Sequence, residues 1–133
     1  MKSNIQIVFP DLDYEEIKIE LNALIAPRTI KAILRNLPIN VDMNRWGDEL
    51  YTDNTGIIVR EKENVKNEVS ELDFAYWPDG NALCLFLGPT PISTDGKILA
   101  YSPVNVVGKI FYSNRGKLLN MIKDKTKVII DGF

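Results

Sequence analysis

The sequence predicts a mainly β protein, a closed β-barrel with two short helices that cap its ends. Short runs of alternating apolar and polar residues, typical of strands, occur about eight or nine times in the 133 residues. Only two stretches show helical spacing of apolar residues, and they do not alternate with strands as in a βαβ protein. Many short strands in one small domain leave exposed edges unless the sheet closes on itself. Closure into a barrel is therefore the expected architecture.

The N-terminal third is expected to form a hairpin, a helix and a third strand. Apolar residues alternate over 4–9 and again over 17–21, with a turn between the two runs. Residues 27–37 switch to apolar positions at i, i+3, i+4 and i+7, which predicts a helix that begins near a proline. Pro38 would end this helix, because it lacks an N–H and clashes with the preceding turn. Alternation then resumes over 39–43.

The rest of the chain is expected to supply the remaining strands and the second helix. WGDELYT at 46–52 is predicted as one strand, followed by a turn and a short extended run at 57–60. The highly charged segment 61–71 is expected to be a solvated loop. Later strands are predicted at 72–77, 82–87, 98–101, 104–112 and 126–130, with a proline-rich loop at 88–97 and a helix around 118–122.

Length and composition indicate one domain that spans residues 1–133. The chain can bury one core, and its 45% hydrophobic and 26% charged residues are ordinary for a soluble globular protein. The net charge of −2 gives no overall attraction to nucleic acid or anionic lipid. No apolar run suits a signal peptide or a membrane span, and a single Cys84 suits a reducing compartment. We therefore expect a cytoplasmic monomer or small homo-oligomer that binds neither nucleic acid nor membranes.

The sequence contains no histidine, which restricts the chemistry that it can perform. Histidine is the commonest general base and the commonest metal ligand in proteins. A Ser–His or Cys–His nucleophile is therefore impossible within this chain, and one cysteine cannot form a thiolate zinc site. We expect no metal and no cofactor. Any reaction would have to use carboxylates, lysine, arginine, tyrosine or backbone dipoles.

Three motifs resemble those of a known family: WGDELY at 46–51, LDFAYWPDGNALCLFLGPTP at 72–91 and YSPVNVVGKI at 101–110. On these motifs the chain resembles the archaeal and bacterial cyclophilin-like family of small stand-alone proteins, with Leu72 where a glycine is usual. The resemblance covers about residues 4–130. It implies a closed eight-stranded barrel, the fold of the peptidyl-prolyl isomerases. It implies no established activity, because fold does not determine function.

The residues of a prolyl isomerase are largely absent. Such an enzyme holds the proline ring in an apolar pocket and directs a donor at the imide nitrogen, and cyclophilins use an arginine for this. The similar strand here, 46–52, has two acids and no arginine, and an ionised carboxylate cannot donate. By the same resemblance, Ala82 and Cys84 replace a glutamine and a pocket phenylalanine. Arg45, just before the strand, is the remaining candidate donor.

The leading hypothesis is a binding module for a peptide segment or small polar ligand, without efficient isomerase activity. Alternation would put Trp46, Asp48 and Leu50 on one face of their strand and Glu49 and Tyr51 on the other. Glu49 and Tyr51 would either bind a cationic or hydroxylated ligand or form an outer-face pair that supports turns. The pocket is expected at the mouth of the barrel, with Arg45 at its edge, lined by Glu49, Tyr51, Asn81, Phe86 and Asn105.

Two enzymatic alternatives remain open, and no catalytic residue is assigned. One is a peptidyl-prolyl isomerase that uses Arg45. The other is a small-molecule hydrolase or lyase that uses Asp48 and Glu49, although neighbours on a strand point to opposite faces. Trp77 is interpreted as fixing a turn, with ligand stacking as the alternative. Cys84 is interpreted as a small buried hydrophobe rather than a reactive thiol.

Overall fold

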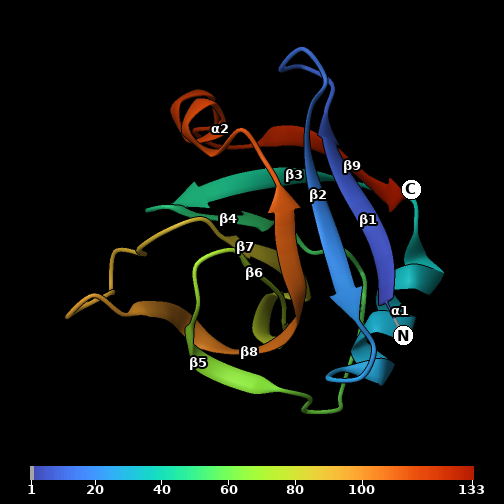
Figure 1. Cartoon of the computed structure of the whole chain (residues 1–133). Helices are drawn as coiled ribbons and strands as arrows, with labels where there is room; N and C mark the ends of the chain where they lie inside the picture. The colour runs from blue at the N-terminus through green and yellow to red at the C-terminus, as the bar shows by residue number, and fades with distance from the viewer. Residues whose placement is uncertain (1) are drawn as a thin grey trace.

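The structure, a computed structural model, describes residues 2–133 and shows a closed antiparallel barrel flanked by two helices (Figure 1). Strands account for 49% of the chain and helices for 15%. The predicted mainly β barrel with two helices is confirmed. The strands are β1 (Lys2–Phe9), β2 (Glu15–Asn22), β3 (Ile39–Trp46), β4 (Glu49–Thr52), β5 (Val65–Val69), β6 (Asp73–Trp77), β7 (Ala82–Phe86), β8 (Ile98–Tyr112) and β9 (Thr126–Gly132). The helices are α1 (Pro27–Asn36) and α2 (Arg115–Met121), with a short 3₁₀ turn, η1 (Pro78–Gly80).

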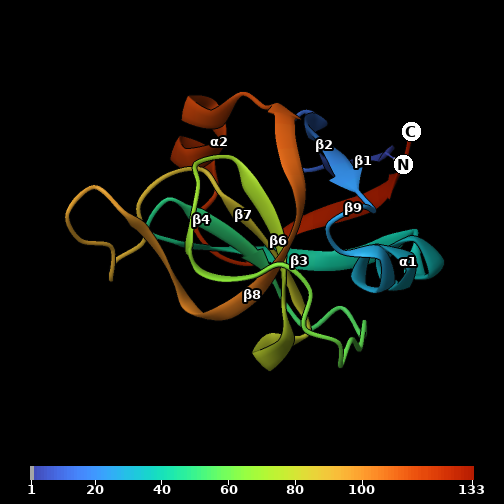
Figure 2. The same cartoon turned by 60° about the horizontal axis from the view of Figure 1, so that its bottom comes forward.

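Within residues 2–133, eight strands close the barrel in the order β2-β1-β9-β3-β4-β7-β6-β8, and β8 pairs back to β2. Gly108 of β8 permits this closure, because a Cβ at that position would overlap the Glu20 carbonyl oxygen of β2. β8 is long and curved (Figure 2). Its C-terminal part pairs with β6 and β2 in the wall, whereas its N-terminal part pairs with β5 outside the ring.

Residues 46–52 do not form the single strand that the sequence predicts. Trp46 ends β3 and Glu49 begins β4, and the two residues are cross-strand partners in a tight hairpin. Gly47 makes the turn with a φ of +63°, a left-handed conformation that favours glycine. The expected alternation of Trp46 with Asp48 and Leu50 is therefore wrong, because the chain reverses between them.

Three other segments differ from the expected elements. The charged segment 61–71 contains β5, whose first four side chains are exposed and whose backbone pairs with β8. The runs 98–101 and 104–112 form one continuous strand, β8. Its pairing with β5 and β6 skips the region of Pro103, which has no N–H to donate. Within residues 2–133, the run 57–60 pairs with no strand and is irregular.

Side-chain alternation along the strands separates two buried apolar clusters among the described residues. The larger cluster fills the barrel and includes Leu83 and Leu85 of β7. The smaller cluster lies on the outer side of the same wall and includes Cys84 and Phe86, together with Val104 of β8. The barrel therefore carries a second apolar surface outside its core, beneath the N-terminal part of β8.

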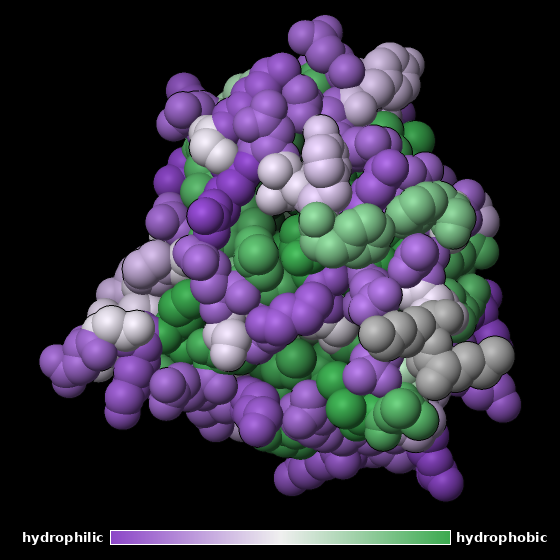
Figure 3. Space-filling model, in the orientation of Figure 1, coloured by the Kyte–Doolittle hydropathy of each residue, from purple (hydrophilic) through white to green (hydrophobic). Residues whose placement is uncertain are grey.

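The helices lie on opposite sides of the barrel and close it over the main core (Figures 1 and 2). α1 buries Ile30 and Ile33, and α2 buries Leu118. In the described part of the chain, neither helix has the length and apolar character needed to cross a membrane. On the face that Figure 3 shows, hydrophobic residues lie in the recesses while the projecting side chains around them are mostly hydrophilic.

Candidate functional site

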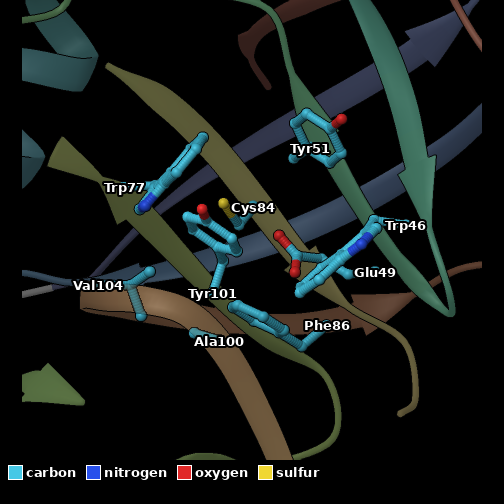
Figure 4. Close-up of a pocket in the computed structure, with 9 residues that line it drawn as sticks. All are labelled: Trp46, Glu49, Tyr51, Trp77, Cys84, Phe86, Ala100, Tyr101 and Val104. Atoms are coloured by element: carbon cyan, nitrogen blue, oxygen red, sulfur yellow. The ribbon is translucent and has the colours of Figure 1, made fainter. Parts of the chain in front are cut away.

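A pocket of about 250 Å³ lies on the outer wall of the barrel, between the sheet β3-β4-β7-β6 and the N-terminal part of β8. The floor of the pocket is formed by cross-strand partners, because residues directly opposite each other on antiparallel strands point to the same face of the sheet. Glu49 lies between its partners Trp46 and Phe86, and Tyr51 lies opposite Cys84. Nine residues line the pocket (Figure 4): Trp46, Glu49, Tyr51, Trp77, Cys84, Phe86, Ala100, Tyr101 and Val104.

The location corrects one expectation from the sequence. A ligand site was expected at the mouth of the barrel, but this pocket lies on the outside of the wall. The interior is filled by the side chains that alternate with the pocket residues, such as Leu50 between Glu49 and Tyr51. Apolar side chains therefore occupy the interior in the described residues, and the outer recess exists because β8 curves over the wall.

Five aromatic rings line the pocket, and all of them except Phe86 contact one another edge to face (Figure 4). Tyr101 lies between the two tryptophans, with ring centroids 5.9 Å from Trp46 and 6.1 Å from Trp77. Trp77 in turn lies 6.5 Å from Tyr51. The interplanar angles are 75°, 84° and 81°, so neighbouring rings present walls of different orientation to the same recess. Tyr101 is 70% exposed, which places it at the entrance.

The WPDG motif fixes the orientation of Trp77. The Trp77 ring packs on Gly80, where a Cβ would lie 2.5 Å from the ring carbons. The indole N–H donates to the Ser102 hydroxyl over 2.6 Å, and that hydroxyl donates to the Asp79 carboxylate over 2.6 Å. The polar edge of Trp77 is therefore tied to β8, while its ring remains in the pocket wall.

The GPTP motif positions the hairpin that carries Trp46 and Glu49. The N–H of Asp48 donates to the Pro89 carbonyl over 2.9 Å, and the N–H of Leu87 donates to the Asp48 carbonyl over 3.0 Å. A Cβ on Gly47 would lie 2.8 Å from the Pro91 ring. The loop and the turn thus fit together closely. This contact holds the first residue of β4, Glu49, at the base of the pocket.

Glu49 is the one acidic residue among the nine that line the pocket, and only 6% of it is exposed. Its carboxyl group points into the group of side chains shown in Figure 4. Burial raises the pKa of Glu49 to about 7, and the Cys84 thiol opposes this shift by donating a hydrogen bond to the carboxyl. At neutral pH the carboxyl is therefore close to half ionised. It can bind a cation or exchange a proton.

Cys84 is buried beside this carboxyl and stays protonated. Burial raises the pKa of the thiol well above its ordinary value, and the negative charge of Glu49 raises it further. Thiolate, not thiol, is the nucleophilic form of cysteine. The interpretation of Cys84 as a small buried hydrophobe agrees with this environment, in which the thiol also serves as a donor to Glu49.

Three of the six predicted site residues lie together in the pocket: Glu49, Tyr51 and Phe86. Arg45 does not line it. Its guanidinium group donates to the backbone carbonyls of Gly47 and Leu119 and pairs with Asp48 at 3.2 Å. These contacts join the β3–β4 turn to α2. Asp48 is outside this pocket as well, so of Arg45, Asp48 and Glu49 only Glu49 lines it.

Asn81 and Asn105 also lie outside the pocket. Asn81 follows η1 with a φ of +48°, and its side-chain oxygen lies 3.0 Å from the Tyr76 hydroxyl. Asn105 is buried and donates to Thr29 Oγ1 over 3.1 Å and to the Glu61 carbonyl over 3.0 Å. These bonds connect β8 to α1 and to the segment before β5. Both amides have structural partners, so they are not free to meet a ligand in this pocket.

Sequence reasoning missed six of the nine lining residues as site members: Trp46, Trp77, Cys84, Ala100, Tyr101 and Val104. Trp46 was assigned to the wrong strand, and Trp77 and Cys84 were interpreted as structural. The available signal was Tyr101, a large aromatic residue that precedes a Ser-Pro pair within an apolar run. Ala100 and Val104 carry no chemical signal, since their place in the pocket follows only from the curvature of β8.

The pocket is lined by few polar groups. It offers one carboxyl, one thiol, two tyrosine hydroxyls and the faces and edges of aromatic rings. Within residues 2–133, no three histidine, cysteine, aspartate or glutamate side chains are grouped so that they could hold a metal ion. The arrangement can enclose an apolar or cationic group and transfer a single proton at Glu49.

Comparison with known proteins agrees with this architecture. The family model described as cyclophilin-like matches residues 3–131. The solution structure of the hypothetical protein AF2241 from Archaeoglobus fulgidus has 40% identity and a TM-score of 0.81, and the match covers 99% of this chain and 95% of that chain.

A more distant structure, McbB in complex with tryptophan, has 16% identity and a TM-score of 0.70. That match covers 96% of this chain but 44% of the McbB chain, and it shows a shared fold. No curated protein matches this sequence. The family model and the 40% identical structure each extend over nearly the whole chain. The chain therefore belongs to the cyclophilin-like family.

Proposed function

We propose that this protein is a binding module that holds a small molecule, or one protruding side chain of a peptide, in the pocket on its outer wall. The observation that carries the proposal is a buried carboxyl, Glu49, at the base of an aromatic-walled recess. Ligand sites are mostly apolar and aromatic concavities with a few convergent polar groups, and titratable groups with shifted pKa values cluster in them.

The size of the pocket restricts the ligand. A volume of about 250 Å³ is below the roughly 300–1,000 Å³ of sites for drug-sized molecules. It suits a small ligand or a single side chain rather than an extended peptide segment. Tyr101 stands at the entrance and is exposed, so it can adjust to an entering group.

Binding is favoured over prolyl isomerisation by the position of the only suggested donor. Arg45 is engaged by two carbonyls and Asp48, and no lysine or arginine lines the pocket among the described residues. A cyclophilin-type isomerase directs an arginine at the imide nitrogen, and Arg45 does not reach this pocket. A hydrolase built on Asp48 and Glu49 lacks support for the same geometric reason, since Asp48 does not reach the pocket.

The proposal is tested by titrating the ¹⁵N-labelled protein with small ligands and following the backbone amide shifts. Tryptophan is a rational first probe, because McbB, a distant relative in fold, is known in complex with it. A set of small amines, alcohols and aromatic compounds extends the search. We expect the shifts to cluster on Glu49, Cys84 and Tyr101.

A matched pair of variants identifies the site. Tyr101→Ala removes an exposed aromatic residue at the pocket entrance, and Phe111→Ala removes an exposed aromatic residue of the same strand outside the pocket. Binding should weaken in the first variant and persist in the second. Equal loss in both variants, or shifts that map away from the pocket for every compound, would overturn the proposal.

A further inference from the structure

We propose that the ligand group bound in this pocket is a weakly hydrated organic cation of the methylated ammonium class, held by the Glu49 carboxylate and the surrounding aromatic rings. This inference rests on the proposed function, because it names the ligand class of the same pocket. Three observations support it: a buried acid without a protein cation, aromatic walls on several sides, and few other hydrogen-bonding groups.

A comparison of two buried acids shows that Glu49 lacks the ion pair that usually stabilises a buried carboxylate. Asp73 is as buried as Glu49, at 7% exposed, but its carboxylate forms a 2.8 Å ion pair with Lys109 and accepts the N–H of Ser70 over 2.8 Å. Glu49 forms no ion pair with any lysine or arginine in the described chain. Its neighbour is the neutral Cys84 thiol. A buried carboxylate is stabilised by an opposite charge, and here a ligand would have to supply it.

The aromatic rings favour a cation over a neutral or anionic group. The faces of tryptophan and tyrosine carry negative electrostatic potential and attract cations, most strongly when water is excluded. Trp46, Trp77, Tyr51 and Tyr101 surround the recess in mutually steep orientations (Figure 4). An anion would meet the negative faces of these rings and the negative charge of Glu49, and none of the nine described lining residues is basic.

The scarcity of acceptors distinguishes a methylated ammonium from a primary one. A primary ammonium carries three N–H donors and is strongly hydrated, so a site for it needs several acceptors. Besides the Glu49 carboxylate, the lining offers two tyrosine hydroxyls and otherwise carbon, sulfur and indole. Methyl groups replace N–H donors and pack against aromatic carbon, which is the chemistry of known aromatic cages for quaternary ammonium ions.

The inference is tested with a pair of compounds of the same shape. Choline and its neutral carbon analogue, 3,3-dimethylbutan-1-ol, are titrated at pH 8 and constant ionic strength, with binding followed by amide shifts. Methylamine and tetramethylammonium form a second pair that varies the number of methyl groups. We expect choline to bind at least about tenfold more tightly than the neutral analogue, and tetramethylammonium to bind more tightly than methylamine.

Two variants assign this preference to the pocket. Trp77→Leu should weaken choline binding by about 3- to 30-fold, the range expected for one cation–π contact. Glu49→Gln should reduce the preference for choline over its neutral analogue. Phe111→Ala serves as the control and should bind choline as the wild type does.

The outcomes separate the ligand class from the binding function. If the neutral analogue binds as tightly as choline at the same residues, the cation inference is overturned and the proposed function stands. Tighter binding of methylamine than of tetramethylammonium would also overturn it, in favour of a primary amine. If choline and its analogue fail to shift the pocket amides, the inference is wrong, and if every compound of the wider set fails as well, the proposed function is also wrong.

Discussion

Trp77 and Ser102 are joined by a hydrogen bond of 2.6 Å from the indole N–H to the hydroxyl oxygen. This bond links β6 in the barrel wall to the part of β8 that leaves the wall. Because Ser102 also donates to Asp79, the three side chains form a polar link along one side of the pocket. The aromatic walls are therefore held by specific contacts outside the recess, which leaves the recess itself nearly free of polar groups.

Removal of this link should loosen Trp77. Ser102→Ala leaves the indole N–H without its partner, and we expect a loss of about 1 kcal/mol in the free energy of unfolding. The tryptophan fluorescence and the side-chain ¹H–¹⁵N signal of Trp77 should change, and choline binding should weaken. Ser113→Ala, after the end of β8, is the control. An unchanged Trp77 signal in Ser102→Ala would contradict the role given to the bond.

The protonation of Glu49 should make stability depend on pH. Its pKa is about 7 in the folded protein and about 4.5 when exposed, so the folded state binds a proton more strongly. The stabilising contribution is fully present below about pH 4.5 and is lost as the pH rises to about 7. This difference amounts to about 3 kcal/mol.

Denaturant unfolding of wild type and Glu49→Gln across pH 4.5–8 measures this effect. The stability of the wild type should fall over this pH range, whereas the stability of Glu49→Gln should not. Above pH 7 the free energy of unfolding of the variant should equal or exceed that of the wild type. Glu68→Gln, an exposed acid on β5, is the control and should follow the wild type. Parallel curves for wild type and Glu49→Gln would show that Glu49 ionises as an ordinary carboxyl.

The affinity for choline should rise as the Glu49 carboxyl loses its proton. A cation binds the ionised form of Glu49, and the ionised fraction of this carboxyl rises as the pH passes through 7. At lower pH the carboxyl must therefore lose its proton before the cation can bind. From pH 5.5 to pH 8 the affinity should increase by about 30-fold. The measurement is a titration at each pH, with 3,3-dimethylbutan-1-ol as the control that should show no such change. A flat profile for choline would mean that its binding is not coupled to Glu49.

Closure of the barrel should depend on Gly108. Gly108→Ala would place a methyl group against the Glu20 carbonyl of the neighbouring strand, and we expect a loss of about 1–3 kcal/mol. Gly116→Ala is the matched control, since its Cβ would lie in open space within α2 and should stabilise the helix by about 0.5–1 kcal/mol. Thermal unfolding of both variants tests this. Equal behaviour would show that β2 and β8 can move apart at no cost.

Arg45 should contribute to structure rather than to catalysis. Arg45→Ala removes the contacts from the β3–β4 turn to Leu119 of α2, so amide exchange in α2 should become faster. The pocket signals of Cys84 and Tyr101 should keep their positions. In a prolyl isomerisation assay, turnover by the wild type that disappears in Arg45→Ala would contradict this and restore the isomerase alternative.

The elements that the sequence predicts well are those whose signal is local. The alternation of Ile5, Ile7 and Phe9 and the helical spacing after Pro27 each lie within one run, and both give elements close to the expected positions. β5 could not be predicted in this way, because its charged side chains indicate a loop and its pairing comes from the backbone of β8. The hairpin at Gly47 was hidden by apparent alternation that continues across the turn.

The candidate site was predictable only in part, for a related reason. Glu49 could be predicted as a site residue, because an acid within a strand is unusual. Tyr51 and Phe86 could be predicted from strand alternation. Asn105 raised the same question, but its partner Thr29 is 76 residues away in the sequence. A polar residue in an apolar run shows that a partner exists without showing whether the partner is a ligand or the protein.

The position of the pocket on the outer wall separates core residues from pocket residues along the same strands. In β7, Leu83 and Leu85 pack in the barrel core, whereas Cys84 and Phe86 face the outer pocket. A substitution at a pocket position therefore changes the lining without placing a new side chain in the barrel core. New recognition properties can be engineered, or can evolve, on an interior that stays the same.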